Sequence, residues 1–403
     1  MKIGVFGGTF NPPHLGHLEA ARTAMDALGL DKLLIIPTAI PPHKQLPEGT
    51  PSPEHRLAMS AKLADALLLP EQVEVSAAEL NRKGKSYTSD TLEALHEKYP
   101  DAQLWLLMGT DMFLTLHQWH DPAAILRLAG ICAFGRNEGD GEAVFAPQLE
   151  HLKKTFPGAR LTTITLPELV EISSTRLRTL LAEGKGAEYL QPSVYGYILL
   201  KGLYGTHADL RRLDIPELRA CSYAMVQEKR VRHIRGTEEE AVRLARRWGA
   251  DETMARRAGI LHDCTKYLTG QEHIAICQQY GVPLDDLERN APKLLHSKTG
   301  ACMARYLFGE PDEVYQAIFW HTTAKADMST LEKILYVADY MEPNRDFDGV
   351  ERLRRLAYAD LDKALLLGVE TTVQEMRDRQ LPVHSNTLQA LAWLREHGVT
   401  TEG

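Results

Sequence analysis

The sequence predicts two domains in series: an α/β domain with a doubly wound parallel sheet over residues 1–202, then an all-helical domain over residues 209–403. Three observations lead to this prediction. The chain has 403 residues, more than one hydrophobic core usually serves. Short apolar runs alternate with helical stretches in the first half, as in a parallel sheet covered by helices. In the second half, long amphipathic stretches dominate and strand-like runs almost disappear.

In the first half, we expect strands at residues 3–6, 33–37, 73–75, 104–108 and 131–134. Helices are expected between them, at residues 18–28, 56–69 and 91–98. Ligands of such sheets bind outside the carboxyl ends of the strands, near the point where the strand order reverses. Residues that directly follow these strands are therefore the first candidates for a binding site.

In the second half, helices are expected at residues 221–233, 238–248, 253–262, 298–308, 331–341 and 360–378. The pattern changes from alternating strands and helices to helices alone at residues 201–208, where glycine occupies positions 202 and 205. Glycine-punctuated stretches between periodic segments are typical of loops, so we expect a linker here.

The composition limits the function classes. Hydrophobic residues make up 44% and charged residues 25%, as in globular proteins, and the formal net charge of −8 disfavours a non-specific nucleic-acid binder. No apolar run is long enough for a membrane span, and the first residues do not resemble a signal peptide. The five cysteines contain no C-x-x-C pair, which favours a reducing compartment. We expect a cytoplasmic protein with no nucleic-acid or membrane partner; a homo-oligomer stays open.

The first candidate site directly follows the first expected strand. Gly7 and Gly8 have no side chains, so a phosphate can approach the backbone closely. A proline at the first helical position would then start a helix whose N-terminus favours an anion. His14 and His17 are three residues apart and would share one helix face toward the phosphates. A glycine pair alone is usually a turn, but the complete run G-G-T-F-N-P-P-H-L-G-H predicts a nucleotide loop.

This run resembles the signature of the nucleotidylyltransferase superfamily, whose members transfer a nucleotidyl group to a phosphorylated acceptor and release pyrophosphate. Five further segments resemble bacterial nicotinate-nucleotide adenylyltransferase: P-P-H-K at 41–44, S-Y-T-S-D-T-L at 86–92, G-T-D at 109–111, L-H-Q-W at 116–119 and I-S-S-T-R-L-R at 172–178. The resemblance covers residues 1–202. It implies a Rossmann-like fold and adenylyl transfer from ATP, with Mg²⁺, to nicotinate mononucleotide.

The resemblance also implies roles for individual residues. His14 and His17 would be catalytic, and the ATP-binding set would be Gly7, Gly8, Thr9, Phe10, His14, His17, Gly109, Asp111, Ser173, Ser174, Thr175 and Arg178. Nicotinate mononucleotide would meet Lys44, Tyr87, Thr88, Trp119 and Arg136. One segment departs from the family: G-R-N-E-G at 135–139 replaces the usual R-P-G around Arg136. Since the acceptor phosphate is already an anion, in-line attack on the α-phosphorus needs no general base.

The second candidate site lies in the helical half. His262 and Asp263 follow the apolar run A-G-I-L at 258–261, and burying such a pair is costly unless it binds something. Imidazole and carboxylate groups are ordinary ligands of iron, manganese or zinc. Lys266 lies four residues beyond His262, so a helix would place both on one face, where the lysine could hold a phosphate.

The order of His233, the His262-Asp263 pair and Asp339 resembles the HD superfamily of metal-dependent phosphohydrolases. L-H-S-K-T-G-A at 295–301, I-F-W-H-T-T at 318–323 and V-A-D-Y-M-E-P-N-R at 337–345 look like the YqeK-type HD family, which is associated with symmetric hydrolysis of diadenosine tetraphosphate to two ADP. This resemblance implies iron or manganese. The implied metal ligands are His233, His262, Asp263, His296, His321 and Asp339, with Lys266 as a catalytic residue and Arg345 on the substrate phosphates.

Two alternatives concern the helical half. His296 and His321 could complete a second metal position, or they could contact the substrate or orient other ligands. The domain could also sense a nucleotide without turning it over, or act on guanosine alarmones or deoxynucleotides instead of a dinucleotide polyphosphate. The leading hypothesis remains a bifunctional enzyme.

Overall fold

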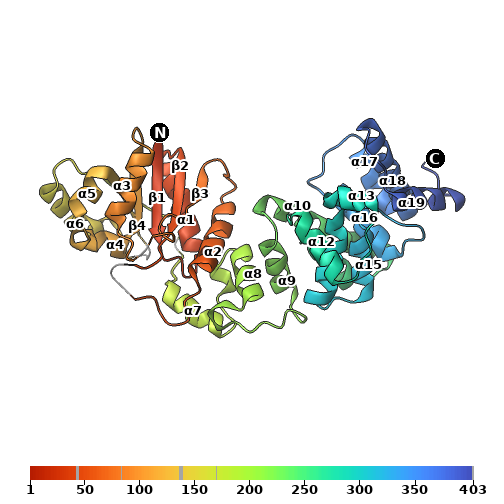
Figure 1. Ribbon diagram of the computed structural model, residues 1–403, viewed down its shortest axis with the longest axis horizontal. Helices are drawn as coiled ribbons and strands as arrows, with labels where there is room; N and C mark the ends of the chain where they lie inside the picture. Colours follow the sequence, from red (N-terminus) through yellow and green to blue (C-terminus); the bar gives the residue numbers. More distant parts are fainter. Residues whose placement is uncertain (42–44, 83, 136–138, 169, 402–403) are drawn as a thin grey trace. The chain divides into compact units, whose positions relative to one another are not determined.

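The computed structural model describes residues 1–41, 45–82, 84–135, 139–168 and 170–401 and contains two compact units, Met1–His207 and Ala208–Gly403 (Figure 1). Helix α8 (Pro192–Lys201) ends at Gly202, whose φ of 58° suits glycine. The 3₁₀ turn that follows, Leu203–Gly205, buries Leu203 and Tyr204 in the core of the first unit. The segment expected as a linker is thus in part packed.

The first unit contains a six-stranded parallel sheet in the order β3-β2-β1-β4-β5-β6, which confirms the predicted α/β class. The strands are β1 (Lys2–Gly8), β2 (Lys32–Pro37), β3 (Val73–Val75), β4 (Gln103–Gly109), β5 (Ala129–Phe134) and β6 (Leu161–Ile164). The order reverses between β1 and β4, so the carboxyl ends of these two strands mark the switch point.

Helices cover both faces of this sheet. They are α1 (Leu15–Leu28), α2 (Pro53–Asp65), α3 (Thr88–Lys98), α4 (Thr110–Thr115), α5 (Pro122–Leu128), α6 (Glu142–Thr155), α7 (Ser174–Ala182) and α8. Successive strand residues point to opposite faces. Accordingly, Leu33 and Ile35 pack with α1, α2, α7 and α8, whereas Leu34 and Ile36 pack with α3, α5 and α6.

The second unit is all-helical, as predicted, and its described residues contain no strand. Its helices are α9 (Ile215–Ala224), α10 (Glu228–Trp248), α11 (Glu252–Leu261), α12 (Gly270–Gln279), α13 (Asp286–Asn290), α14 (His296–Cys302), α15 (Asp312–Trp320), α16 (Thr330–Met341), α17 (Val350–Ala359), α18 (Leu361–Asp378) and α19 (Ser385–Glu396). A short π-helical turn, Met303–Leu307, continues α14.

The predicted helix division at residues 233–238 is wrong. Helix α10 is continuous from Glu228 to Trp248, and the break lies upstream, between Ala224 and Glu228. Gly236 sits inside α10 for a packing reason: a Cβ there would lie 2.3 Å from Glu342 Oε2. His233 therefore lies in the middle part of α10, next to Asp339 and Glu342 at the C-terminal end of α16.

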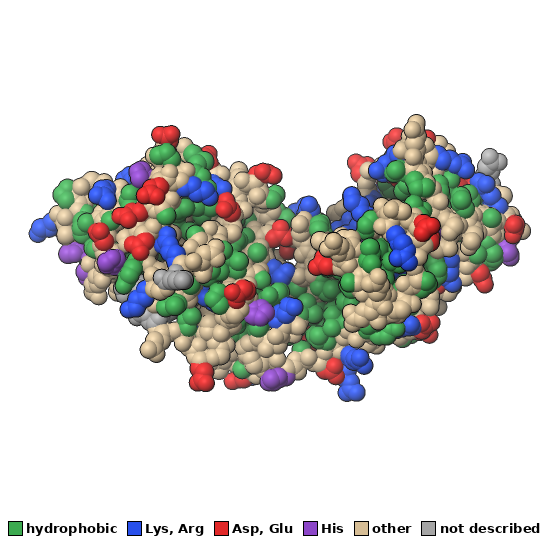
Figure 2. All heavy atoms as spheres, in the orientation of Figure 1, with side chains coloured by type: hydrophobic (Ala, Val, Ile, Leu, Met, Phe, Trp, Pro, Cys, Tyr) green, Lys and Arg blue, Asp and Glu red, His purple; other side chains and the backbone are tan. Residues whose placement is uncertain are grey.

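Helices α10, α11 and α16 pack against one another and form the frame of the second unit. Gly259 of α11 permits the closest approach, because a Cβ there would lie 2.7 Å from Glu238 Cα of α10. Acidic and basic side chains are interspersed over the face drawn in Figure 2, so neither sign dominates it. Among the described residues, no helix combines the length and the apolar character that a membrane span demands.

Candidate active sites

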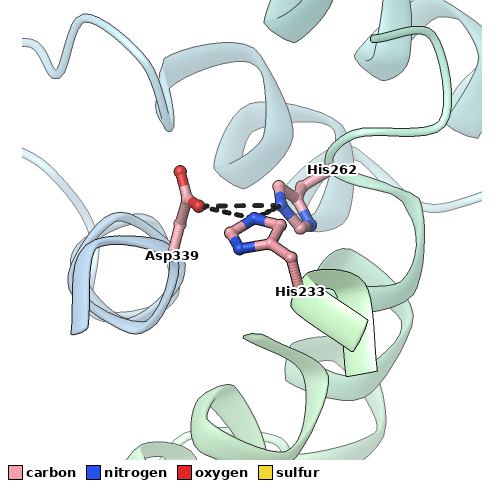
Figure 3. Close-up of side chains that lie close together, drawn as sticks. All are labelled: His233, His262 and Asp339. Carbon is pink, nitrogen blue, oxygen red and sulfur yellow. Dashed lines mark hydrogen bonds and ion pairs between the residues drawn. The ribbon is translucent and has the colours of Figure 1, made fainter. Parts of the chain in front are cut away.

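Three helices of the second unit bring their polar residues to one point. His233 comes from α10, His262 directly follows α11, and Asp339 comes from α16 (Figure 3). Asp339 Oδ1 lies 2.9 Å from His233 Nε2 and 3.8 Å from His262 Nε2, and the two Nε2 atoms are 3.1 Å apart. Residues far apart in the sequence thus aim three ligand atoms at one small volume.

A second group of ligand atoms lies beside the first. Asp263 Oδ1 is 3.3 Å from His296 Nε2, which is 3.2 Å from His321 Nε2. The other oxygen of the same carboxylate, Oδ2, is 3.5 Å from the Nε2 atoms of both His233 and His262. Asp263 therefore presents one oxygen to each group, so its carboxylate would be available as a ligand in both.

Hydrogen bonds fix which ring nitrogen is available in each of the four histidines, and in His233 it is Nε2, because Nδ1 lies 3.1 Å from the carboxylate oxygen Oε1 of Glu342. The Nδ1 atoms of His262, His296 and His321 lie 2.7–2.8 Å from the carbonyl oxygens of Gly259, Lys293 and Ile318, which can only accept. Their Nδ1 atoms therefore carry the proton and their Nε2 atoms hold a lone pair. Two such lone pairs cannot bond each other across 3.1–3.2 Å, whereas a cation between them can bind both. The donor set fits a metal ion.

The pKa shifts of His296 and His321 give the same neutral state, whereas burial of His233 is outweighed by hydrogen bonds to Asp339 and Glu342, which raise its pKa. Burial and the adjacent Lys266 hold the pKa of His296 well below its usual range, and burial lowers that of His321 to about 4. Burial alone would raise the pKa of Asp263, but His262, His296 and Lys266 outweigh it and hold this pKa well below the ordinary value. Neutral imidazoles with ionised carboxylates are the states that bind a metal.

Two residues that the sequence analysis missed support the ligands. Glu342 is 1% exposed and lies with Oε1 3.1 Å from His233 Nδ1, so it orients that ring. Arg230 donates from Nε to Asp263 Oδ2 at 2.5 Å. Glu342 is three residues after Asp339, and Arg230 is three residues before His233. This i,i+3 spacing beside expected ligands is the signal that could have identified both.

The two predicted phosphate-binding cations border the metal ligands. Lys266 Nζ lies 2.9 Å from His296 Nε2 and 3.4 Å from Asp263 Oδ1. The helix-face argument for Lys266 is wrong, because α11 ends at Leu261 and a series of turns carries Lys266 back. Arg345 donates to Asp339 Oδ1 at 2.9 Å. Both cations line a cavity of about 1180 Å³ together with His296, His321 and Asp339.

In the first unit, the glycine pair Gly7-Gly8 ends β1 at the switch point, and the loop to α1 follows it. A Cβ at Gly7 would meet no atom within 4 Å, so the backbone there is open to a ligand. The helix begins at Leu15 with His14 as its N-cap, so the expectation of a proline at the first helical position is wrong. The rings of His14 and His17 are 3.9 Å apart. A Cβ at Gly16 would lie 3.1 Å from His14 Nδ1, which explains the glycine between them.

His17 is oriented by the backbone. Its Nδ1 accepts a hydrogen bond from the His14 N–H at 3.2 Å, so the neutral ring carries its proton on Nε2. That N–H can donate to a phosphate oxygen. Helix α7 approaches the same loop, since Arg178 donates to the carbonyl of Asn11 at 2.9 Å and to Thr175 Oγ1 at 3.2 Å. Ser173 caps α7 by accepting from the N–H of Arg176.

The other predicted residues of the first unit lie at helix N-termini or in turns. Gly109 ends β4 and caps α4, whose first turn holds Thr110 and Asp111. Tyr87 precedes α3, which begins at Thr88, and its ring lies 4.2 Å from that of His120, next to Trp119. Gly8 ends β1, Thr9 and Phe10 follow it, and Ser174 begins α7. Lys44 and Arg136 lie outside the described residues.

Arg56 of α2 is a further residue that the sequence analysis missed. It is 1% exposed and donates from Nη1 to the carbonyls of Thr9, at 2.9 Å, and Thr38, at 2.6 Å. Its Nη2 donates to the carbonyl of Ala39 at 3.3 Å. Arg56 thereby ties the loop after β1 to the segment after β2. An arginine on a helix is usually solvated, so only the tertiary structure distinguishes it.

A third cluster joins Asp285, Glu288 and His384. His384 Nδ1 accepts from the N–H of Asn386 at 3.1 Å, so Nε2 carries the proton and faces the two carboxylates. Lys298 Nζ lies 2.6 Å from Glu288 Oε1. The two carboxylates already face the cation of Lys298 and the N–H of His384, so this cluster fastens the start of α19; its described residues offer no imidazole lone pair to a metal.

The two units of the chain are similar to different known proteins. Two family models match, Cytidylyltransferase-like over residues 5–180 and HD domain over residues 230–344. A "Probable nicotinate-nucleotide adenylyltransferase" of Desulfitobacterium hafniense (strain Y51) is 39% identical over 206 residues, which are 50% of this chain and 95% of that protein.

The second half has its own relatives. The "Bis(5'-nucleosyl)-tetraphosphatase, symmetrical" of Bacillus subtilis (strain 168) is 37% identical over 179 residues, which are 44% of this chain and 96% of that protein. A crystal structure described as a "predicted HD superfamily hydrolase involved in NAD metabolism", from Clostridium acetobutylicum, has 38% identity and a TM-score of 0.45, and covers 46% of this chain and 98% of its own. The chain therefore belongs to the nicotinate-nucleotide adenylyltransferase family in its first half and to the HD-domain symmetrical tetraphosphatase family in its second.

Proposed function

We propose that this chain is a bifunctional enzyme. The first unit transfers the adenylyl group of ATP to nicotinate mononucleotide, giving nicotinate adenine dinucleotide and pyrophosphate. The second unit hydrolyses diadenosine tetraphosphate to two ADP. The convergence of six ligand groups beside two cations carries the second assignment, and the ordered loop of His14 and His17 at the switch point supports the first.

In adenylyl transfer, the work of the first unit is positioning and charge stabilisation. The phosphate of nicotinate mononucleotide is the nucleophile, and MgATP supplies the electrophilic α-phosphorus. His17 donates its Nε2–H to the triphosphate, while Arg178 and the N-terminus of α7 add positive charge where the pyrophosphate leaves. The open backbone at Gly7 lets the phosphates approach the loop.

In hydrolysis, His233, His262, Asp339 and Asp263 would hold one divalent cation, and Asp263, His296 and His321 a second; we propose iron or manganese. Such a metal, when bound, lowers the pKa of water and polarises phosphoryl oxygens. Lys266 and Arg345 bind the substrate phosphates, and Lys266 is placed to neutralise the charge of the departing ADP. Glu342 and Arg230 keep His233 and Asp263 in position.

The test is a substrate panel on the purified, manganese- or iron-loaded full chain. We expect nicotinate mononucleotide plus MgATP to yield the dinucleotide, and diadenosine tetraphosphate to yield ADP only. Products AMP and ATP would contradict the symmetric cleavage. Guanosine tetraphosphate and deoxynucleoside triphosphates in the same panel test the other substrates, and binding without any turnover would identify a sensing module. We place both reactions in the cytoplasm, since all five cysteines are buried and free.

A further inference from the structure

A buried network of hydroxyl and imidazole groups lies next to the second group of ligand atoms. It runs from His273 of α12 through Thr299 of α14 to Thr265, which lies in the turns after α11. His273 Nδ1 is 2.8 Å from Thr299 Oγ1, and the two threonine Oγ1 atoms are 2.9 Å apart. All three side chains are at most 3% exposed, so water does not compete for these bonds and each of them restrains the chain.

Two main-chain carbonyls fix the directions of these bonds. Thr299 Oγ1 donates to the carbonyl of Leu295 at 2.9 Å. Thr265 Oγ1 lies 2.9 Å from the carbonyl oxygen of His296 and 2.9 Å from Thr299 Oγ1, so it shares its one proton between these two acceptors. Because the Thr299 proton is engaged by Leu295, the Thr299 oxygen accepts from His273 Nδ1–H. Burial lowers the pKa of His273, so the ring is neutral and carries its one proton on Nδ1.

The network joins the two chain segments that supply most of the second group. Asp263 and Thr265 lie in the turns after α11, whereas His296 begins α14, and the Thr265 hydroxyl bonds the main chain of His296. Helix α14 packs directly on these turns, because a Cβ at Gly300 would lie 3.0 Å from the carbonyl oxygen of His262. Across this joint, Asp263 Oδ1 and His296 Nε2 lie 3.3 Å apart. The separation of these two ligand atoms therefore depends on how the network holds His296.

The first group of ligand atoms is supported by other residues. His233 and Asp339 come from α10 and α16, and Glu342 orients the His233 ring through its Nδ1. His262 Nδ1 lies 2.8 Å from the carbonyl oxygen of Gly259. Within the part of the chain that the structure describes, the network makes no hydrogen bond to the side chains of the first group. A change in the network should therefore affect the second group and leave the first group in place.

We propose that His273 is a positioning residue for the cation that the second group of ligand atoms would hold, and that α12 thereby sets the affinity of this position alone. The proposal rests on the two-cation site of the function proposed above. His273 holds the Thr299 hydroxyl, and the two threonines hold the main chain at His296. The Nε2 atom of His296 thereby stays within reach of the cation that Asp263 would share. His273 touches neither cation nor substrate and acts only through His296.

The experiment titrates manganese into the metal-free full chain and measures both dissociation constants from the electron paramagnetic resonance of free Mn²⁺. His321→Ala identifies the constant that belongs to the second group. We expect His273→Ala to raise this constant about ten-fold or more, as loss of a residue that orients a metal ligand does, and to leave the other constant within about two-fold. His273→Asn keeps a donor near the position of Nδ1 and should restore tight binding.

Two further variants separate the network from the packing of the helix. Thr299→Val removes the hydroxyl but keeps the side-chain volume, and it should weaken the same position as His273→Ala. The matched control is Cys277→Ala, which also removes a buried side chain of α12 and should change neither constant. Turnover of diadenosine tetraphosphate by His273→Ala should fall at limiting manganese and recover at saturating manganese, because the reacting groups are unchanged.

Equal weakening of both constants, no change in either, or the same loss in Cys277→Ala would overturn the positioning role of His273. Failure of the proposed function has different signatures. A wild-type chain that binds two manganese ions without cleaving diadenosine tetraphosphate contradicts the proposed substrate, and the titration still tests His273. A wild-type chain that binds a single manganese ion overturns both the two-cation site and the role of His273.

Discussion

At the residue scale, Arg56 joins two segments of the nucleotide site, the loop after β1 and the segment after β2. Its guanidinium is buried and donates to the carbonyls of Thr9, Thr38 and Ala39. We expect Arg56→Met to lower the free energy of unfolding by about 2 kcal/mol, because the three hydrogen bonds from a charged donor would be lost. Chemical denaturation and the KM for ATP measure this, with Arg176→Met on the exposed side of α7 as the control. If Arg56→Met and Arg176→Met have equal stability and an equal KM for ATP, Arg56 does not hold the two segments in place.

Individual residues also differ in whether their role could be predicted from the sequence. His262 and Asp263 could be proposed from the sequence because they follow an apolar helical run, and His233 and Asp339 because their order around this pair resembles the HD superfamily. Arg56 could not, since a helical arginine is usually solvated and only its carbonyl partners, which lie elsewhere in the sequence, distinguish it. The role of such a residue can be recognised only from the tertiary structure.

At the element scale, the cluster around Glu288 holds α13, α14 and α19 together. Burial acts against the carboxylate, but His384 and Lys298 outweigh it and lower the pKa of Glu288 to about 2. A depressed pKa gives stability that is complete above the ordinary value near 4.5 and is lost as the pH falls toward 2. We expect this group to contribute a loss of about 1 kcal/mol between pH 7 and pH 3.5.

Urea denaturation of wild type, Glu288→Gln and the exposed control Glu313→Gln at the two pH values tests this. Glu288→Gln should be less stable than wild type at pH 7 and should show a smaller decrease on acidification. A pH dependence identical to that of the control would show that the cluster contributes nothing.

The accuracy of the sequence prediction also varies by element. Strands β1, β2, β4 and β5 were predictable because each is a continuous apolar run buried on both faces. Strand β6, L-T-T-I, pairs only with β5 and is half-buried throughout, so its pattern is too weak to identify. The false break in α10 has a different cause. Gly236 serves the packing of Glu342, which no local pattern reveals.

At the scale of the whole molecule, each candidate site is complete within one unit. The nucleotide loop and Arg178 lie in Met1–His207, and all metal ligands lie in Ala208–Gly403. We expect the fragments 1–207 and 208–403 to fold and act separately. A fragment 1–202 should be less stable than 1–207 by roughly 2 kcal/mol or more, because it loses the buried Leu203 and Tyr204. Equal melting curves of fragments 1–202 and 1–207 would place the boundary at residue 202.

The central claim is that one chain carries two independent active sites. The most direct measurement follows both reactions, and the metal content, in His17→Ala and His262→Ala, with the exposed His96→Ala as the control. His17→Ala should reduce dinucleotide synthesis at least about 100-fold, as loss of a charge-stabilising donor does, and leave hydrolysis unchanged. His262→Ala should lose its metal and its hydrolysis and keep synthesis within about two-fold. A His262→Ala protein that retains metal and hydrolysis, or either substitution abolishing both reactions, would contradict the account.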